Sequence, residues 1–130
     1  MSLLLGLDFG TGGVRVGVFD IERRAIIAST EVTYPTAHPR HGWAEQSPDA
    51  WWDALGEASR RTMHQAGYPA IAGVAVATTA STVVVCGRDG RPARPALLWM
   101  DCRAGAEAAL TAQSAHPVIC LLYTSDAADE

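Results

Sequence analysis

The fold is decided near the N-terminus by the stretch Leu7-Asp8-Phe9-Gly10-Thr11-Gly12-Gly13-Val14-Arg15. An apolar run precedes the glycines, and the residues from Val14 to Phe19 alternate with a period of two. This pattern predicts that the glycines connect one β-strand to a second. In Rossmann and P-loop nucleotide sites the glycines instead lead into a helix. Both motifs are excluded, the P-loop also because the chain has no lysine.

The predicted hairpin carries groups that suit a phosphate. Glycines allow backbone N–H groups to approach an anion closely, while Thr11 adds a hydroxyl donor and Arg15 a guanidinium. The Asp8 carboxylate repels phosphate but suits a Mg²⁺ ion that bridges phosphate oxygens through water. The alternative is an ordinary β-hairpin with a tight glycine turn and a surface salt bridge. The stretch by itself leaves both interpretations open.

Composition narrows the class of protein. The net charge is −4 and the ten basic residues are scattered, which argues against a nucleic-acid partner. No secretory signal precedes the first strand, and the apolar run 70–80 is too short to span a membrane. The three cysteines lie far apart without a CxxC pair, as is typical of reduced thiols. We therefore expect a cytoplasmic protein without a membrane partner.

The rest of the chain alternates strand and helix signals. Ser47-Pro48-Asp49 predicts a helix with a serine cap, which ends near Gly67. The predicted strands are Leu3–Phe9, Val14–Phe19, Ala25–Thr33, a short buried strand at Gly73–Ala77, and Thr82–Cys86. A turn at 88–91, an apolar segment at 96–100 and a helix at 104–113 follow. This order predicts an α/β domain with a mixed sheet, and its glycine hairpin resembles that of the actin-like (ribonuclease H-like) ATPase fold.

Three segments together resemble the N-terminal domain of the FGGY family of carbohydrate kinases. The first is Gly6-Leu7-Asp8-Phe9-Gly10-Thr11, with Arg15 and Asp20 downstream. The second is Gly42-Trp43-Ala44-Glu45-Gln46-Ser47-Pro48, followed by Trp51-Trp52. The third is Asp89-Gly90-Arg91-Pro92, followed by Arg94-Pro95-Ala96-Leu97-Leu98-Trp99-Met100-Asp101-Cys102-Arg103-Ala104. The resemblance runs from about Leu4 to Glu107.

The resemblance implies the N-terminal half of a two-domain sugar kinase that uses ATP and Mg²⁺. The residues implied to bind the nucleotide phosphates are Asp8, Gly10, Thr11, Gly12, Gly13 and Arg15, with Asp8 toward the metal. Trp99 and Asp101 match positions that lie against the sugar or polyol in related kinases. An indole can stack on a C–H face and a carboxylate can accept from hydroxyls. A core aromatic and a helix cap are the alternatives.

The segment Thr78-Thr79-Ala80-Ser81 departs from the family pattern. Xylulose kinases carry a Gln-Met-His-Gly type of segment here, and glycerol kinases an Arg-Glu pair. Small hydroxyl residues are closer to ribulose-kinase-like members, which makes Thr79 and Ser81 candidates for binding sugar hydroxyls. The alternative is a Thr/Ser-rich strand edge. Glu45 and Gln46 are expected to hold their loop to the following helix.

The implied function is ATP-dependent phosphorylation of a small sugar or polyol, a ketopentose such as ribulose or xylulose. A non-catalytic actin-like nucleotide-binding or scaffold module is the alternative. The family's general base, an aspartate, is expected beyond the end of this chain, so the isolated chain is expected to be inactive. A homodimer of the full-length protein is left open. We expect residues 1–119 to form an incomplete FGGY-type domain, while 120–130 resembles a translated sequencing-adapter tail.

Overall fold

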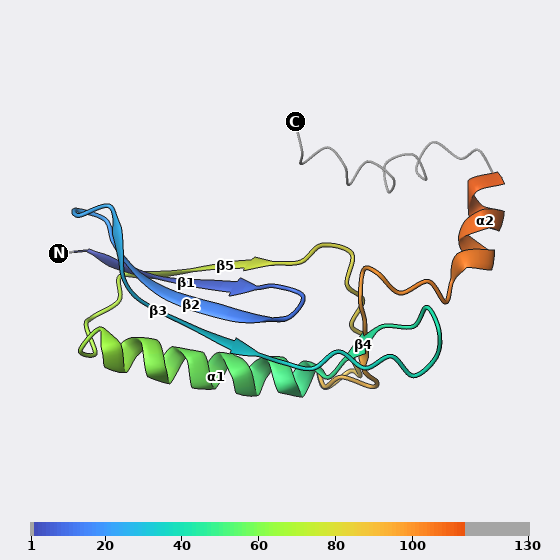
Figure 1. Ribbon diagram of the computed structural model, residues 1–130, viewed down its shortest axis with the longest axis horizontal. Helices are drawn as coiled ribbons and strands as arrows, with labels where there is room; N and C mark the ends of the chain where they lie inside the picture. The colour runs from blue at the N-terminus through green and yellow to red at the C-terminus, as the bar shows by residue number, and fades with distance from the viewer. Residues whose placement is uncertain (1, 114–130) are drawn as a thin grey trace.

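The computed structural model describes residues 2–113, and the predicted adapter-derived tail lies outside them. Its centre is a four-stranded mixed sheet in the order β3-β2-β1-β5 (Figure 1). The first three strands form an antiparallel meander, whereas β5 pairs with β1 in parallel. The strands are β1 (Leu3–Phe9), β2 (Gly13–Asp20), β3 (Ala25–Thr33) and β5 (Gly73–Thr78). The predicted α/β domain with a mixed sheet is confirmed.

One long helix, α1 (Pro48–Gln65), covers a single face of this sheet (Figure 1). Its buried residues Ala54, Ala58 and Thr62 recur at helical spacing, and the two alanines pack against valines of β2. The helix ends as predicted, because Gly67 adopts a positive φ of +75° just beyond it. The predicted serine cap is only half correct. Ser47 is the N-cap residue, yet its side chain makes no capping hydrogen bond.

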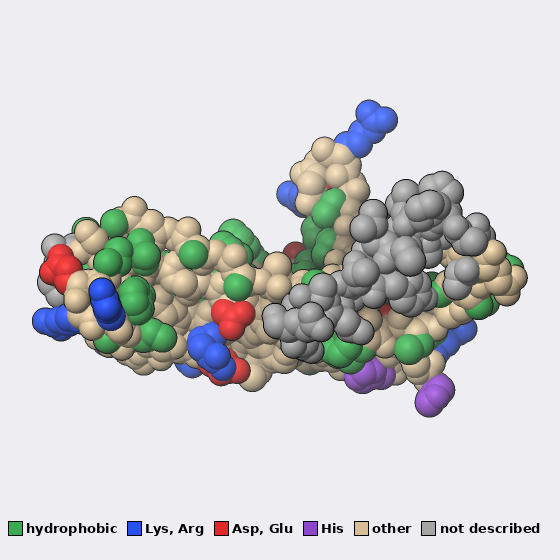
Figure 2. All heavy atoms as spheres, turned by 90° about the horizontal axis from the view of Figure 1, so that it is seen from above, with side chains coloured by type: hydrophobic (Ala, Val, Ile, Leu, Met, Phe, Trp, Pro, Cys, Tyr) green, Lys and Arg blue, Asp and Glu red, His purple; other side chains and the backbone are tan. Residues whose placement is uncertain are grey.

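Within residues 2–113, no helix covers the opposite face of this sheet (Figure 1). Alternation along β2 buries Val14, Val16 and Val18 beneath α1 and turns Arg15 and Phe19 the other way. Seen from the side away from α1, hydrophobic side chains gather over the sheet, with acidic and basic side chains among them (Figure 2).

Two predictions for the second half of the chain are wrong. The strand β5 forms at the expected place but is largely exposed, because it is the edge of the described sheet and α1 does not cover it. The segment 82–86 forms no regular strand and makes only two isolated bridges, Val83 with Leu97 and Cys86 with Pro92. Prolines at 92 and 95 lack the N–H groups that a continuous ladder needs.

The remaining elements, β4, β6 and α2, lie beyond the N-terminal end of α1. A two-stranded sheet joins β4 (Glu45–Gln46) to β6 (Ala96–Leu97) and thereby connects segments that lie about fifty residues apart in the chain. The last helix, α2 (Gly105–Gln113), follows where the sequence predicts it. Within residues 2–113, no helix is long and apolar enough to cross a membrane.

Candidate functional site

The glycine hairpin between β1 and β2 is held from inside the protein. The Tyr34 hydroxyl lies 2.5 Å from the carbonyl oxygen of Gly10 and 2.9 Å from that of Gly13, so it shares its one proton between them. Gln46 Nε2 donates to the Thr11 carbonyl at 2.7 Å. In a planar trans peptide the N–H points away from the C=O. The N–H groups of Thr11 and Gly12 are therefore directed away from Tyr34 and Gln46.

Gln46 has no unused polar atom in this arrangement. Its side chain is buried, its Nε2 also donates to Thr36 Oγ1 at 2.7 Å, and its Oε1 accepts from Trp51 Nε1 at 2.8 Å. The expectation that Gln46 holds its loop to the helix is confirmed, since Trp51 belongs to α1. Sequence reasoning missed the further bond to Thr11 and missed Tyr34 entirely.

The Tyr34 hydroxyl remains a donor over the physiological range. Burial raises the pKa of Tyr34, and the nearby Asp8 charge raises it further. Both effects disfavour the phenolate, so the proton that holds Gly10 and Gly13 is retained.

The outer side of the hairpin borders a cavity of about 280 Å³. Five of the six predicted phosphate-binding residues line it: Asp8, Gly10, Gly12, Gly13 and Arg15. Asp8 and Arg15 are cross-strand partners, and Arg15 Nη2 donates to Glu31 Oε2 at 2.9 Å. That bond raises the pKa of the Arg15 guanidinium. The structure thus contains the salt bridge of the ordinary-hairpin alternative, but exposed pairs of this kind are weak and readily exchanged.

Thr11, the sixth predicted phosphate-binding residue, does not line that cavity but a second one, of about 460 Å³. The second cavity is lined by Thr11, Thr79, Ala80, Ser81 and Trp99, which include three of the four predicted sugar-binding residues. Trp99 Nε1 donates to Thr11 Oγ1 at 3.1 Å, although the tryptophan is 57% exposed. Trp99 is therefore not a core aromatic. Thr11 lines this cavity and also belongs to the glycine hairpin, so the two regions share a residue.

The fourth predicted sugar-binding residue, Asp101, lies outside that cavity. Its side chain is 4% exposed and accepts from Arg103 Nε and Nη2 at 2.8 and 2.7 Å, and from the Ala44 N–H at 2.7 Å. The hydrogen bonds from Arg103 hold the pKa of Asp101 well below its usual range. Its contact with a sugar stays a prediction, because protein donors occupy both carboxylate oxygens.

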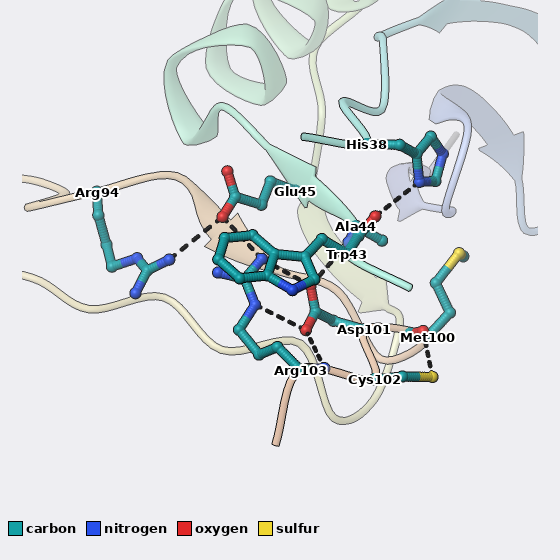
Figure 3. Close-up of polar contacts among 9 residues, drawn as sticks. All are labelled: His38, Trp43, Ala44, Glu45, Arg94, Met100, Asp101, Cys102 and Arg103. Atoms are coloured by element: carbon teal, nitrogen blue, oxygen red, sulfur yellow. Dashed lines mark hydrogen bonds and ion pairs between the residues drawn. The ribbon is translucent and has the colours of Figure 1, made fainter. Parts of the chain in front are cut away.

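Arg103 is the centre of a polar cluster that we call the Arg103 cluster, drawn in Figure 3. Its guanidinium lies 3.9 Å from the centroid of the Trp43 ring. Arg103 and Arg94 both bind Glu45 Oε1, at 2.7 and 3.2 Å. The members of the cluster are Trp43, Glu45, Arg94, Asp101 and Arg103. The cluster therefore joins the two tryptophan-containing segments that the sequence analysis treats separately.

Asp8 is the residue best suited to a metal near the hairpin. It is exposed on the open face, within the cavity that the glycines line. In the described part of the chain, no group of three His, Cys, Asp or Glu side chains could hold a metal ion. A single carboxylate nevertheless fits Mg²⁺, which keeps several waters and takes its other ligands from phosphate oxygens.

Solved structures of sugar kinases share this architecture. The xylulose kinase from Rhodospirillum rubrum superposes with a TM-score of 0.81 at 24% identity, covering 86% of this chain and 23% of that one. The kinase from Brucella ovis, described as a xyloylose kinase, gives 0.77 at 30% identity, covering 84% and 23%. The structure is therefore an N-terminal domain of the actin-like ATPase fold, as predicted.

The sequence comparisons agree. Residues 3–117 match the FGGY family of carbohydrate kinases, N-terminal domain, and the chain belongs to this family. It is 30% identical over 107 residues to the xylulose kinase of Staphylococcus xylosus, covering 82% of this chain and 22% of that enzyme. It is 35% identical over 106 residues to the glycerol kinase of Thermococcus gammatolerans, covering 80% and 21%. The chain thus spans less than a quarter of these relatives.

Proposed function

We propose that the full-length protein carrying this domain transfers a phosphoryl group from ATP to a hydroxyl of a small sugar or polyol. The observation that carries the proposal is the position of Thr11. Thr11 lines the same cavity as Trp99, Thr79 and Ser81, and the Thr11 backbone is part of the glycine hairpin. A phosphate on the hairpin and a hydroxyl compound in that cavity are therefore neighbours, as phosphoryl transfer requires.

The hairpin supplies binding and orientation. The outward N–H groups of Thr11 and Gly12, together with the Thr11 hydroxyl, donate to phosphate oxygens, and Arg15 exchanges Glu31 for the phosphate. Asp8 would hold the Mg²⁺ ion, which would neutralise charge on the phosphate oxygens. The general base that deprotonates the attacking hydroxyl is expected in a part of the protein outside this chain.

A ketopentose such as ribulose or xylulose is the acceptor that we favour. Thr79 and Ser81 in the cavity wall carry small hydroxyl side chains, which can accept from and donate to sugar hydroxyls without filling the space. Among the relatives, both xylulose and glycerol kinases occur. The bulkier or charged segments expected of those two classes are absent from residues 78–81, which favours ribulose between the two ketopentoses.

The test is a substrate screen on the full-length protein. Ribulose, xylulose and glycerol are each supplied with Mg²⁺ and ATP, and ADP release is measured against a control without acceptor. We expect acceptor-dependent ADP release that is largest with a ketopentose. Nucleotide binding without ADP release for any acceptor would contradict the proposal and favour the non-catalytic nucleotide-binding module.

A further inference from the structure

Trp99 is an exposed aromatic side chain on a rigidly held turn. The turn Leu98–Asp101 is closed by a hydrogen bond from the Asp101 N–H to the Leu98 carbonyl at 2.9 Å. Two more bonds fasten it to Ala44, from Leu98 N–H to the Ala44 carbonyl at 3.1 Å and from Ala44 N–H to Asp101 Oδ2 at 2.7 Å. The backbone is thus fixed, while the indole remains 57% exposed in the larger cavity.

The Arg103 cluster supports this turn from behind. Asp101 can hold Ala44 because Arg103 neutralises its buried carboxylate, and Arg103 in turn is flanked by Glu45 and the Trp43 ring (Figure 3). Removing these charged side chains from water costs free energy, and an exposed turn that only connects two elements does not need them. Their presence indicates that the direction of the Trp99 side chain matters.

The Trp99 side chain points toward the glycine hairpin. Its indole N–H donates to Thr11 Oγ1, and a hydroxyl that accepts one hydrogen bond keeps its own proton for another acceptor. The backbone of Thr11 is already held by Gln46 at 2.7 Å. The indole therefore holds the Thr11 hydroxyl in an orientation that leaves its proton available to a phosphate oxygen.

In water this hydrogen bond is weak, because solvent competes for both partners. A sugar that lies on the indole displaces that water and restricts the rotation of the ring, which strengthens the bond. The Thr11 hydroxyl is then ordered before the nucleotide arrives, so the nucleotide no longer bears the entropy of ordering it.

We propose that the hydrogen bond between Trp99 Nε1 and Thr11 Oγ1 couples the two cavities, so that sugar binding tightens nucleotide binding. The inference rests on the proposed function and adds to it an energetic link within the site. Trp99 acts here as a positioning residue for Thr11. Because coupling is reciprocal, nucleotide binding must tighten sugar binding by the same factor.

The test measures nucleotide affinity with and without sugar in the full-length protein. The probes are a non-hydrolysable ATP analogue with Mg²⁺, titrated by calorimetry in the absence and in the presence of saturating ribulose. Trp99→Phe keeps an aromatic face but removes the N–H, and Thr11→Val removes the hydroxyl. Thr11→Ser restores the hydroxyl, and Trp52→Phe changes an exposed tryptophan on α1 that is remote from the site.

We expect ribulose to raise the affinity for the analogue about tenfold in the unsubstituted protein, within the usual range of coupling between sites. Trp99→Phe and Thr11→Val should each reduce this factor about fivefold, and the double variant no further. Thr11→Ser and Trp52→Phe should retain it. An undiminished factor in Trp99→Phe, or additive losses in the double variant, would overturn the inference.

The two proposals fail in different ways. A protein that releases ADP with ribulose but keeps full coupling in Trp99→Phe contradicts the inference and leaves the proposed function standing. A protein that loses coupling in Trp99→Phe but releases no ADP with any acceptor contradicts the proposed function and supports the coupling.

Discussion

At the scale of single residues, Arg103 does what no lysine could do in its place. Its planar guanidinium donates to two carboxylates and also stacks on an indole, which requires a flat fork of donors. Through Asp101 it fixes Ala44 and the turn that carries Trp99. A substitution at Asp101 is therefore expected to weaken sugar binding through Trp99.

The Asp101 carboxylate should also make the stability of the protein pH-dependent. Its pKa is lowered in the folded state, so its contribution is complete above the unfolded pKa of about 4 and is lost as the pH falls toward the folded value. Asp101→Asn should lower the free energy of unfolding at pH 7 and flatten its decline between pH 5 and pH 3. Urea denaturation of the full-length protein measures this. Asp53→Asn, on an exposed part of α1, is the control and should change neither quantity.

Asp8 should affect catalysis and not the affinity for sugar. Asp8→Ala removes the carboxylate proposed to hold Mg²⁺, so kcat in the full-length protein should fall about a hundredfold or more. The KM for the sugar should stay nearly unchanged, because Asp8 lines the hairpin cavity and not the cavity of Trp99. Steady-state kinetics with both substrates varied gives the two constants. Loss of sugar affinity with normal ATP turnover would invert the assignment.

At the scale of elements, two glycines of the hairpin between β1 and β2 should differ in how far they tolerate a side chain. A Cβ at Gly13 would lie 2.8 Å from the Val32 carbonyl oxygen and 3.1 Å from Thr33 Cα, both in the backbone of β3. A Cβ at Gly12 would meet nothing within 4 Å. Gly13→Ala should therefore push β2 from β3 and lower the free energy of unfolding by about 1–3 kcal/mol, whereas Gly12→Ala should change it little. Equal losses in chemical denaturation would contradict this.

Local patterns predicted most of these elements. An apolar run predicted β1 and period-two alternation predicted β2. A proline at the helix start and a glycine after its end predicted α1 to within a few residues. The errors fall where neighbours far along the chain decide the outcome. Residues 82–86 have strand-like composition, but their partners include Pro92 and supply only isolated bridges. Whether β5 is buried depends on which other element covers this edge strand, and the local sequence of β5 cannot predict that.

The same distinction applies to the site. The hairpin residues are contiguous, so their chemistry could be predicted from one stretch of sequence. Tyr34 reaches Gly10 across 24 positions and Gln46 reaches Thr11 across 35, and no spacing rule predicts such contacts. Asp101 was expected to contact the sugar together with Trp99, because both match positions that lie against the sugar or polyol in related kinases. The turn between them directs the two side chains to different neighbours.

At the scale of the whole molecule, the described residues leave apolar surface uncovered. The sheet has a helix on one face only (Figure 1). Val74 and Val76 are 60% and 64% exposed on the edge strand β5, on the face that α1 covers elsewhere, and Ile26 is 65% exposed on the opposite edge strand β3. Exposed apolar side chains that lie together, as Val74 and Val76 do on one side of β5, commonly mark a contact with another part of a protein. The chain spans only 22% of the xylulose kinase that it matches, which provides ample further structure for such a contact.

This surface predicts how the isolated chain behaves. We expect residues 1–130 alone to form soluble oligomers or aggregates and to show no kinase activity, while the full-length protein elutes as a defined species. Size-exclusion chromatography with light scattering measures the first and ADP release the second. Replacing Val74 and Val76 by threonine keeps the β-propensity of β5 but makes its exposed surface polar. The double variant should shift the isolated chain toward monomer without restoring activity, because the general base is expected in a part of the protein outside this chain. A monomeric isolated chain that phosphorylates a ketopentose would contradict both expectations.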